Sequence, residues 1–295
     1  MTTQALLDTL AVPATSSRRT VNGIALHVVE AGPAGGPLVI LLHGFPEFWW
    51  GWRRQIAALA EAGCRVVVPD QRGYNLSDKP RGVRAYGLDR LAADVVALAD
   101  ACGRRTFHVV GHDWGGLVAW WVATRHPERV ERLGILNAPH PEVVGPYARA
   151  HPSQARKSAY VAWFQLPWLP EWSLARRGFA ALRRALRGSS RRGTFPDADL
   201  AVYDAAWAQA GALTGMLNWY RALRHRPSAP GVRIAAPTLL IWGEGDLFLE
   251  RGLAEASLAL CDRGEAAWFE TATHWVHLEE AEAVNARLVA FLTRS

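Results

Sequence analysis

The run Gly111-His112-Asp113-Trp114-Gly115-Gly116 places a carboxylate on a sharp turn between an apolar strand, Phe107 to Val110, and an apolar helix. In a nucleophile elbow the central residue projects above the sheet, and the next backbone N–H helps to form an oxyanion hole. A serine that opened a strained C–O bond at a saturated carbon would leave an ether, which water does not easily cleave. A carboxylate would leave an ester, which water can hydrolyse. Asp113 therefore predicts covalent catalysis through an ester.

A carboxylate nucleophile needs a base that brings water to the ester, and a candidate follows later in the chain. His274 lies in Thr273-His274-Trp275, after an apolar strand that ends near Glu270. Asp246 lies in Gly243-Glu244-Gly245-Asp246, on a turn after another apolar strand, and could orient the histidine. Catalytic groups in open α/β sheets gather at the carboxyl edge of the strands. The order of nucleophile, acid and histidine matches that of α/β-hydrolases.

Short apolar runs, many flanked by glycine or proline, predict the strands that must carry these residues. They are Ile24 to Val29, Leu38 to Leu42, Arg65 to Pro69, Phe107 to Gly111, Leu133 to Asn137, Thr238 to Trp242 and Ala266 to Glu270. Helical patterns lie between several of them, such as the one through Leu88, Leu91, Val95 and Leu98 that Gly103 ends. Alternating strands and helices predict an α/β fold with a mostly parallel sheet flanked by helices.

The alternation of strands and helices stops after Pro139 and resumes near Pro237. The stretch between is rich in Trp and Arg, and contains helix-like runs around 158–164, 174–186 and 200–220. An inserted helical cap explains it better than so long a loop. We expect a core domain of residues 1–139 and 231–295, with a helical cap or lid of residues 140–230.

Composition limits the possible classes of protein. The chain has 295 residues, is half hydrophobic, and its apolar runs are too short to span a bilayer. Its start lacks the pattern of a signal peptide, and its three cysteines have no disulfide or metal-ligand spacing, so we expect a cytoplasmic protein. The net charge of +6 is concentrated in an amphipathic arginine-rich stretch at 176–192. We interpret that stretch as a solvated helix face and expect neither a nucleic-acid nor a membrane partner.

Five segments in the same order resemble the soluble-type epoxide hydrolases of the α/β-hydrolase superfamily, over nearly the whole chain. They are the HGxP motif in His43-Gly44-Phe45-Pro46-Glu47, the aspartate elbow at 111–116, the cap segments Tyr160 to Gln165 and Asn218 to Arg221, and the histidine loop His274-Trp275. The two cap segments are similar to those that supply the family's ring-opening tyrosines. No one segment is decisive, but the five together are specific.

The resemblance implies a role for each matching residue. Asp113 would attack an epoxide carbon while the hydroxyls of Tyr160 and Tyr220 hydrogen-bond the ring oxygen, because a basic alkoxide needs a neutral donor to leave. Water activated by His274 would then hydrolyse the ester, with Asp246 orienting the imidazole. By the same resemblance, the N–H groups of Phe45 and Trp114 would form the oxyanion hole, Glu47 and His112 would help to place the water, and the Phe45–Pro46 peptide would be cis.

Some assignments have competitors. Glu244 competes with Asp246 as the orienting acid, and we favour Asp246. His277 lies close to His274, but only His274 has the matching tryptophan neighbour, so we interpret His277 as a packed or surface histidine. We expect Trp163, Phe164 and Trp219 to line an apolar substrate cavity beneath the cap.

Two other classes of function stay open. A haloalkane or haloacid dehalogenase shares the aspartate nucleophile and can cradle halide with a tryptophan such as Trp114, but halide needs no proton, so the tyrosine pair favours an epoxide. A non-catalytic ligand-binding protein on this scaffold is a weaker alternative, because all the expected catalytic residues are present. We expect an apolar epoxide and water as the only partners, no metal or other cofactor, and a monomer or homodimer.

Overall fold

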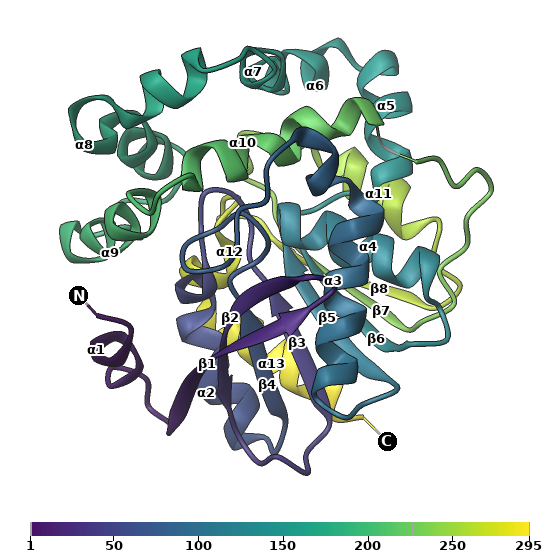
Figure 1. The fold of residues 1–295 in the computed structure, drawn as a ribbon. Helices are drawn as coiled ribbons and strands as arrows, with labels where there is room; N and C mark the ends of the chain where they lie inside the picture. Colours follow the sequence, from purple (N-terminus) through teal and green to yellow (C-terminus); the bar gives the residue numbers. More distant parts are fainter. Residues whose placement is uncertain (1, 226, 295) are drawn as a thin grey trace.

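The computed structural model describes residues 2–225 and 227–294. Within them, the centre of the fold is an eight-stranded sheet in the order β1-β2-β4-β3-β5-β6-β7-β8 (Figure 1). β1 pairs with β2, and β2 with β4, in antiparallel fashion, whereas every later pair is parallel. The strands are β1 (Ala14–Val21), β2 (Ile24–Ala31), β3 (Leu38–Leu42), β4 (Arg65–Pro69), β5 (Phe107–His112), β6 (Val130–Leu136), β7 (Thr238–Gly243) and β8 (Gly264–Phe269).

Helices cover both faces of this sheet, as its apolar strands require. Every residue of β3, β5 and β7 is buried, which is the pattern of parallel strands that have helices on both sides. α3 packs against α4, and α2 packs against α13 (Figure 1). The α-helices outside the β6–β7 segment are α1 (Thr3–Leu7), α2 (Arg53–Glu61), α3 (Leu88–Ala101), α4 (Trp114–Arg125), α11 (Arg251–Leu258), α12 (Val276–Glu279) and α13 (Ala281–Leu292). The expected α/β-hydrolase fold with a mostly parallel sheet is confirmed.

The described residues between β6 and β7 form helices and add no strand to the sheet, and Figure 1 shows these helices together beyond one end of the sheet. We call α5 to α10 the cap helices. They are α5 (Pro141–Ala150), α6 (Pro152–Lys157), α7 (Tyr160–Phe164), α8 (Leu169–Gly188), α9 (Asp197–Trp207) and α10 (Ala212–Ala222). None of the helices in the described part of the chain combines the length and the apolar character that a membrane crossing requires.

The structure corrects several predicted elements. β1 was not predicted, because this edge strand is largely exposed and has no alternation of apolar residues. The helical run at 200–220 is two helices, α9 and α10, and Gly211 lies between them with a φ of 78° that favours glycine. The predicted helix at 174–186 lies within α8, but its residues Arg176 to Phe179 depart from helical φ and ψ values and kink it.

Candidate active site

Asp113 occupies the turn between β5 and α4, with a φ of 50° and a ψ of −121°. A non-glycine residue rarely has this conformation, and here it projects the side chain beyond the end of the strand. The neighbouring glycines leave room for the turn. A Cβ atom on Gly111 would lie 2.2 Å from the carbonyl oxygen of Gly115, and one on Gly115 would lie 2.0 Å from that of Leu42. The glycines of the elbow are therefore a steric requirement.

The HGxP segment follows β3, which pairs with β5 in the sheet, and its backbone lies against this elbow. A Cβ atom on Gly44 would lie 2.4 Å from that of Asp113, so the two backbones approach as closely as glycine permits. The N–H of Phe45 donates to Oδ1 of Asp113 at 2.8 Å. The expected cis peptide joins Phe45 to Pro46. Trp114 begins helix α4, where backbone N–H groups have no partner within the helix. Of the two predicted oxyanion donors, the N–H of Phe45 thus contacts the carboxylate, and Trp114 follows Asp113 at the start of the helix.

His274 lies between two carboxylates at the carboxyl edge of the sheet. Its Nδ1 is 2.7 Å from Oδ2 of Asp246, and its Nε2 is 3.5 Å from Oδ2 of Asp113. The backbone N–H groups of Phe248 and Leu249 donate to Oδ1 of Asp246 at 2.7 Å and 3.0 Å. Asp246 is therefore fixed by its own loop and can orient the imidazole, whereas its competitor Glu244 forms an ion pair with Arg251.

The charges of this trio depend on one another. Burial opposes the charged form of His274, but the carboxylates of Asp246 and Asp113 outweigh it and raise the pKa of the imidazole to about 10. Burial also opposes ionisation of Asp246, but His274 and the hydrogen bonds it accepts lower its pKa. The neighbouring carboxylates thus favour the imidazolium form of His274.

A cavity of about 220 Å³ opens above Asp113 and His274. Tyr160 and Tyr220 line it from α7 and α10. Apolar side chains of α8, including Leu174, form another part of its wall. The cavity thus has an apolar lining with a few polar groups, which suits a small apolar substrate.

Aromatic packing positions the two tyrosines. Their ring centroids are 6.0 Å apart, and Phe164 contacts both, at 5.5 Å from Tyr160 and 4.9 Å from Tyr220. The rings of Phe45 and Trp114 also contact Tyr220, at 5.3 Å and 4.8 Å. Burial, together with the Asp113 carboxylate, raises the pKa of both phenols above their ordinary value. Both hydroxyls stay protonated at neutral pH and can donate hydrogen bonds into the cavity.

Comparisons with known proteins place this geometry in a family. The family model of the alpha/beta hydrolase fold matches residues 37–281. Epoxide hydrolase 4 of Homo sapiens is 37% identical over 92% of this chain and 76% of its own length. Epoxide hydrolase A of Mycobacterium tuberculosis is 34% identical over 92% of this chain and 95% of its own length. A crystal structure of a Bacillus megaterium epoxide hydrolase in complex with an inhibitor aligns with a TM-score of 0.87 and 29% identity, over 94% of this chain and 100% of that chain.

The chain belongs to the epoxide hydrolases of the α/β-hydrolase family. This finding favours an epoxide hydrolase over the dehalogenase and the non-catalytic binding protein that the sequence left open. The five predicted catalytic residues come from separate parts of the chain and lie around one cavity or directly behind it. They are Asp113, His274, Asp246, Tyr160 and Tyr220.

Of the three residues predicted to line the substrate pocket of this epoxide hydrolase, two do not line the cavity. Phe164 lines the cavity, but Trp163 is 40% exposed on the outside of α7. Trp219 is buried away from the cavity, where its indole N–H donates to the carbonyl oxygen of Arg72 at 2.9 Å. Neighbouring residues in a helix point about 100° apart, so Phe164 and Tyr220 face the cavity while the tryptophans beside them do not.

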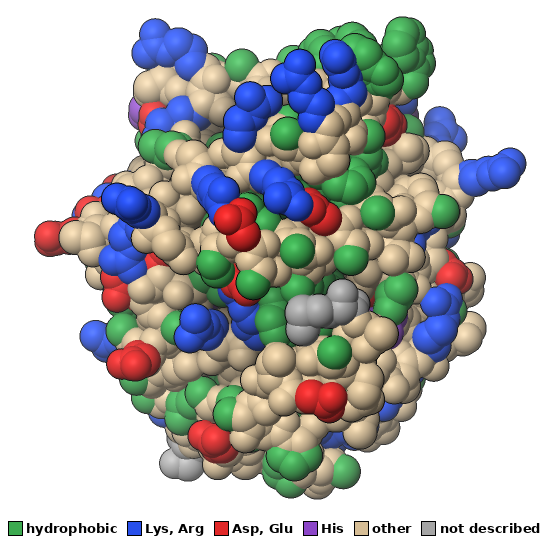
Figure 2. Space-filling view, turned by 90° about the vertical axis from the view of Figure 1, so that its left-hand side faces the viewer, with side chains coloured by type: hydrophobic (Ala, Val, Ile, Leu, Met, Phe, Trp, Pro, Cys, Tyr) green, Lys and Arg blue, Asp and Glu red, His purple; other side chains and the backbone are tan. Residues whose placement is uncertain are grey.

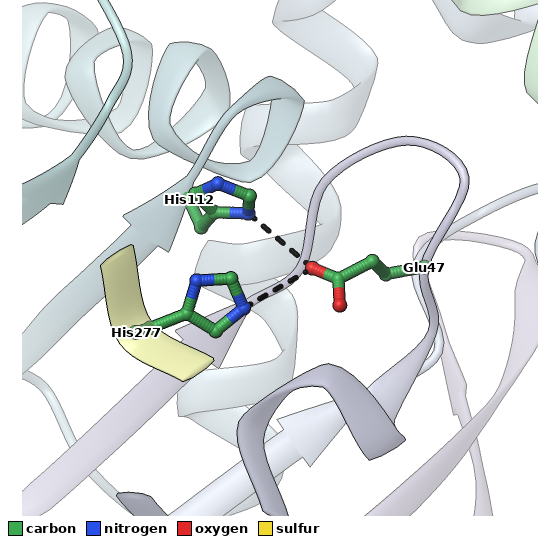
Figure 3. Close-up of side chains that lie close together, drawn as sticks. All are labelled: Glu47, His112 and His277. Carbon is green, nitrogen blue, oxygen red and sulfur yellow. Dashed lines mark ion pairs between the residues drawn. The ribbon is translucent and has the colours of Figure 1, made fainter. Parts of the chain in front are cut away.

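Glu47 and His112, predicted to place the water, lie beneath the cavity and do not line it. Figure 3 shows the Glu47 carboxylate reaching both His112 and His277, each at 3.3 Å from Oε2. Burial opposes ionisation of Glu47, but the two imidazoles hold its pKa well below the ordinary value. The hydroxyl of Tyr203, on α9, donates to Oε1 at 2.8 Å. His277, interpreted as packed or surface, is buried in this cluster.

The Glu47, His112 and His277 cluster contacts the loop that carries the catalytic histidine. Nε2 of His112 lies 2.9 Å from the carbonyl oxygen of His274. Three potential metal ligands also meet here within 4.8 Å, which makes it the one candidate metal cluster among the described residues. The Tyr203 hydroxyl and the two imidazoles already surround the Glu47 carboxylate, and burial together with the neighbouring His112 lowers the pKa of His277 to about 4. We therefore interpret the cluster as a buried support of the site.

Two groups of residues near the site were missed. Asn137, at the end of β6, donates to Oδ2 of Asp246 at 2.8 Å and accepts from the N–H of Gly243 at 2.9 Å. Its place at the end of a predicted strand could have indicated this role. Leu182, Ala185, Leu186 and Ser189 line the cavity from the stretch that was interpreted only as a basic helix. The apolar positions between its arginines were the signal for that face.

Proposed function

We propose that this epoxide hydrolase converts small apolar epoxides to vicinal diols through an ester on Asp113. One observation carries the proposal: Asp113 lines the same apolar cavity as the phenols of Tyr160 and Tyr220. The N–H of Phe45 donates to Oδ1 of its carboxylate, and Nε2 of His274 lies 3.5 Å from Oδ2. The carboxylate attacks a saturated ring carbon, and the C–O bond to the ring oxygen breaks. A tyrosine hydroxyl gives its proton to that oxygen, which becomes the first hydroxyl of the product.

The same step prepares His274 to act as a base. The ester carries no charge, so one of the two carboxylates that raise the pKa of the imidazole is lost. The pKa falls, and the imidazolium releases a proton that can restore the tyrosine hydroxyl. Ester formation therefore produces a neutral imidazole with Nε2 free to accept a proton from water, while Asp246 holds Nδ1.

Hydrolysis then regenerates the resting site. His274 takes a proton from water, and the resulting hydroxide attacks the carboxyl carbon of Asp113. The N–H groups of Phe45 and Trp114 are suited to bind the oxyanion of the tetrahedral intermediate. Cleavage of the acyl–oxygen bond releases the second oxygen of the diol, which takes the proton of the Asp113 carboxyl group. The site returns to a carboxylate beside an imidazolium. Glu47 and His112 help to place the water by supporting the His274 loop from below.

We further infer that residues 140–230 act as a cap domain over a core of residues 1–139 and 231–295. The contribution of α7, α8 and α10 to the cavity wall supports this division. We expect the enzyme to act in the cytoplasm as a monomer or homodimer, on a substrate small enough for about 220 Å³.

Product analysis tests the proposed function. We expect a diol from a simple aromatic epoxide and no halide release from haloalkanes of similar size. Over many turnovers in labelled water, the diol should take up one labelled oxygen. After one turnover in labelled water, the label should appear in the Asp113 peptide, because water attacks the carboxyl carbon. Halide release without diol formation would contradict the proposed substrate class. Label found only in the diol would instead contradict the ester mechanism.

A further inference from the structure

The net positive charge of the chain lies in part of the cap. Residues 143–196 contain ten Lys and Arg residues but only one acidic residue, Glu171. The remaining 241 residues contain 23 basic and 26 acidic residues, so the rest of the molecule is slightly acidic. Glu171 itself forms an ion pair with Arg221. The molecule is therefore electrically polarised, with its basic end at the cap.

The same segment exposes large apolar side chains. Four of them lie within ten residues, where α7 ends and α8 begins: Trp163, Leu166, Trp168 and Trp172. Trp168 is 72% exposed and Trp172 is 55% exposed. Figure 2 shows hydrophobic side chains along the upper edge of the molecule, with Lys and Arg side chains beside them. Single exposed apolar residues are ordinary, but a group of this size usually marks a contact surface.

Several arginines of this segment have no acidic partner. Arg183 and Arg187 pair with Asp204 and Asp197. Arg176 and Arg177 are exposed and form no ion pair within the described residues. The guanidinium carbon of Arg176 lies 4.4 Å from the ring centroid of Trp172, so a cation and an aromatic ring share one surface. We call Trp168, Trp172, Arg176 and Arg177 the tryptophan–arginine surface.

Helix α8 connects this surface with the substrate cavity. Trp172 is exposed on its N-terminal part, and Arg176 and Arg177 are exposed where its kink begins. Apolar side chains on both sides of the kink, Leu174 and Leu182, line the cavity. Whatever contacts the outside of α8 is therefore one helix away from the substrate. A lipophilic epoxide reaches such a cavity most directly from a lipid phase.

We propose that the tryptophan–arginine surface docks the enzyme on an anionic lipid bilayer. Tryptophan is suited to the boundary between headgroups and acyl chains, and arginine to lipid phosphates. Charge complementarity favours this partner over a second copy of the chain, because a two-fold contact of the patch with itself would bring unpaired arginines together. This differs from the expectation that no membrane partner exists. The contact lies at the membrane surface and needs no spanning helix.

Vesicle sedimentation tests the proposal on the whole protein. Vesicles of phosphatidylcholine alone are compared with vesicles of phosphatidylcholine mixed with phosphatidylglycerol. We expect binding to the mixed vesicles only, and we expect it to weaken as salt is added, because salt screens the attraction. Equal binding to both kinds of vesicle, or no binding to either, would overturn the proposal.

Two pairs of substitutions locate the contact. Arg176→Gln with Arg177→Gln should weaken binding by about fivefold for each arginine. Trp168→Ser with Trp172→Ser should also reduce it, since these side chains enter the interface. The matched control is Arg54→Gln with Arg287→Gln, two exposed arginines on α2 and α13. All variants should keep wild-type turnover of a water-soluble epoxide, which shows that they are folded.

Other partners for the surface give different results. If the control pair weakened vesicle binding as much as the cap pair, net charge would explain the binding and the proposed site would be wrong. Light scattering that showed a dimer broken by the tryptophan substitutions would assign the surface to a second copy. Binding of a single-stranded oligonucleotide that displaced the vesicles and depended on the same tryptophans would assign it to nucleic acid. Either result would overturn the lipid proposal.

Discussion

The core side and the cap side of the site hold their functional groups by different means. On the core side, Asp113 and His274 lie on turns at the ends of strands, where glycine contacts and hydrogen bonds to charged groups fix them. On the cap side, Tyr160 and Tyr220 lie on two helices and are positioned by contacts among aromatic rings. The core side is thus set by backbone geometry and charge, and the cap side by packing.

This difference separates the fixed part of the chemistry from the adaptable part. A hydrogen-bonded turn has few alternative geometries, so the nucleophile and the base should tolerate almost no substitution. An aromatic wall can repack around substrates of different shape. We therefore expect core substitutions to abolish steps of the reaction, and cap substitutions to change rates and selectivity by smaller factors.

The largest effect is expected at the nucleophile. Asp113→Asn removes the charge that attacks the epoxide and should reduce turnover by roughly 10⁴-fold or more. Diol formation measured by chromatography checks this result. The exposed aspartate Asp262, changed to asparagine, serves as a control and should keep wild-type activity. Persistent turnover in the Asp113 variant would contradict covalent catalysis.

The next effect concerns the base and is specific to one step. His274→Gln should still allow ester formation but slow hydrolysis by roughly 10²- to 10⁴-fold, the usual contribution of a general base. Intact-mass measurement should then show an adduct of one substrate mass on the peptide that contains Asp113. His277→Gln, which leaves His274 in place, should accumulate much less adduct than His274→Gln. An adduct in that variant alone would exchange the roles of the two histidines.

The cap tyrosines should have a smaller effect each. Tyr160→Phe and Tyr220→Phe each remove one hydrogen bond to a developing alkoxide, and we expect ring opening to slow by about 10- to 100-fold in each case. The double variant should be nearly inactive. Single-turnover kinetics of ester formation measure this step directly. Tyr147→Phe, on α5 outside the cavity, is the control and should keep the wild-type rate. Wild-type rates in all the cavity variants would show that the two tyrosines take no part in ring opening.

The charge coupling across the core side can be measured by pH titration. NMR should give His274 a pKa of about 10 in the wild type and a lower one in Asp113→Asn, which removes a neighbouring carboxylate. The folded pKa lies above the ordinary value of about 6.5, so this group stabilises the fold fully below that pH. The contribution is then lost as the pH rises towards about 10. Urea unfolding across this range should show a smaller loss in Asp113→Asn, and an unchanged pKa would contradict the coupling.

The smallest effect is expected from the packing that positions the tyrosines. Phe164→Leu keeps an apolar side chain but removes the ring that contacts both Tyr160 and Tyr220. We expect the rate of ring opening to fall by up to about tenfold, comparable with one misplaced hydrogen bond, and the enantiomer preference to change. Chiral analysis of the diols measures both. Trp163→Leu, its neighbour on the outside of α7, should change neither.

The core side could be predicted from the sequence because its positions follow from local rules. A glycine-rich turn after an apolar strand fixes where Asp113 projects, and parallel strands bring Asp246 and His274 to the same edge. The predicted ends of the strands were less accurate than the predicted positions of these residues. β6 begins at Val130 and β8 at Gly264, earlier than predicted, because partly exposed residues at the start of a strand break the apolar pattern.

The cap side could be predicted only in part. The sequence identified helices and their aromatic residues, but not which side chains of each helix face inward. Trp163 and Phe164 are adjacent and both aromatic, as are Trp219 and Tyr220, and in each pair only the second lines the cavity. Their sequence pattern contains no signal that separates them, because both members of each pair are compatible with a buried face.

By itself, the sequence determined the α/β order, the carboxylate at the elbow, and the acid and histidine that follow it. Those features depend on residue type and on short-range backbone geometry, which a chain carries wherever it folds. The tertiary structure alone decided which aromatic rings enclose the substrate, how Glu47 joins His112 and His277, and that the arginine-rich helix also lines the cavity. One step along a helix turns a side chain by about 100°, and only packing against the rest of the molecule fixes the rotation of each helix.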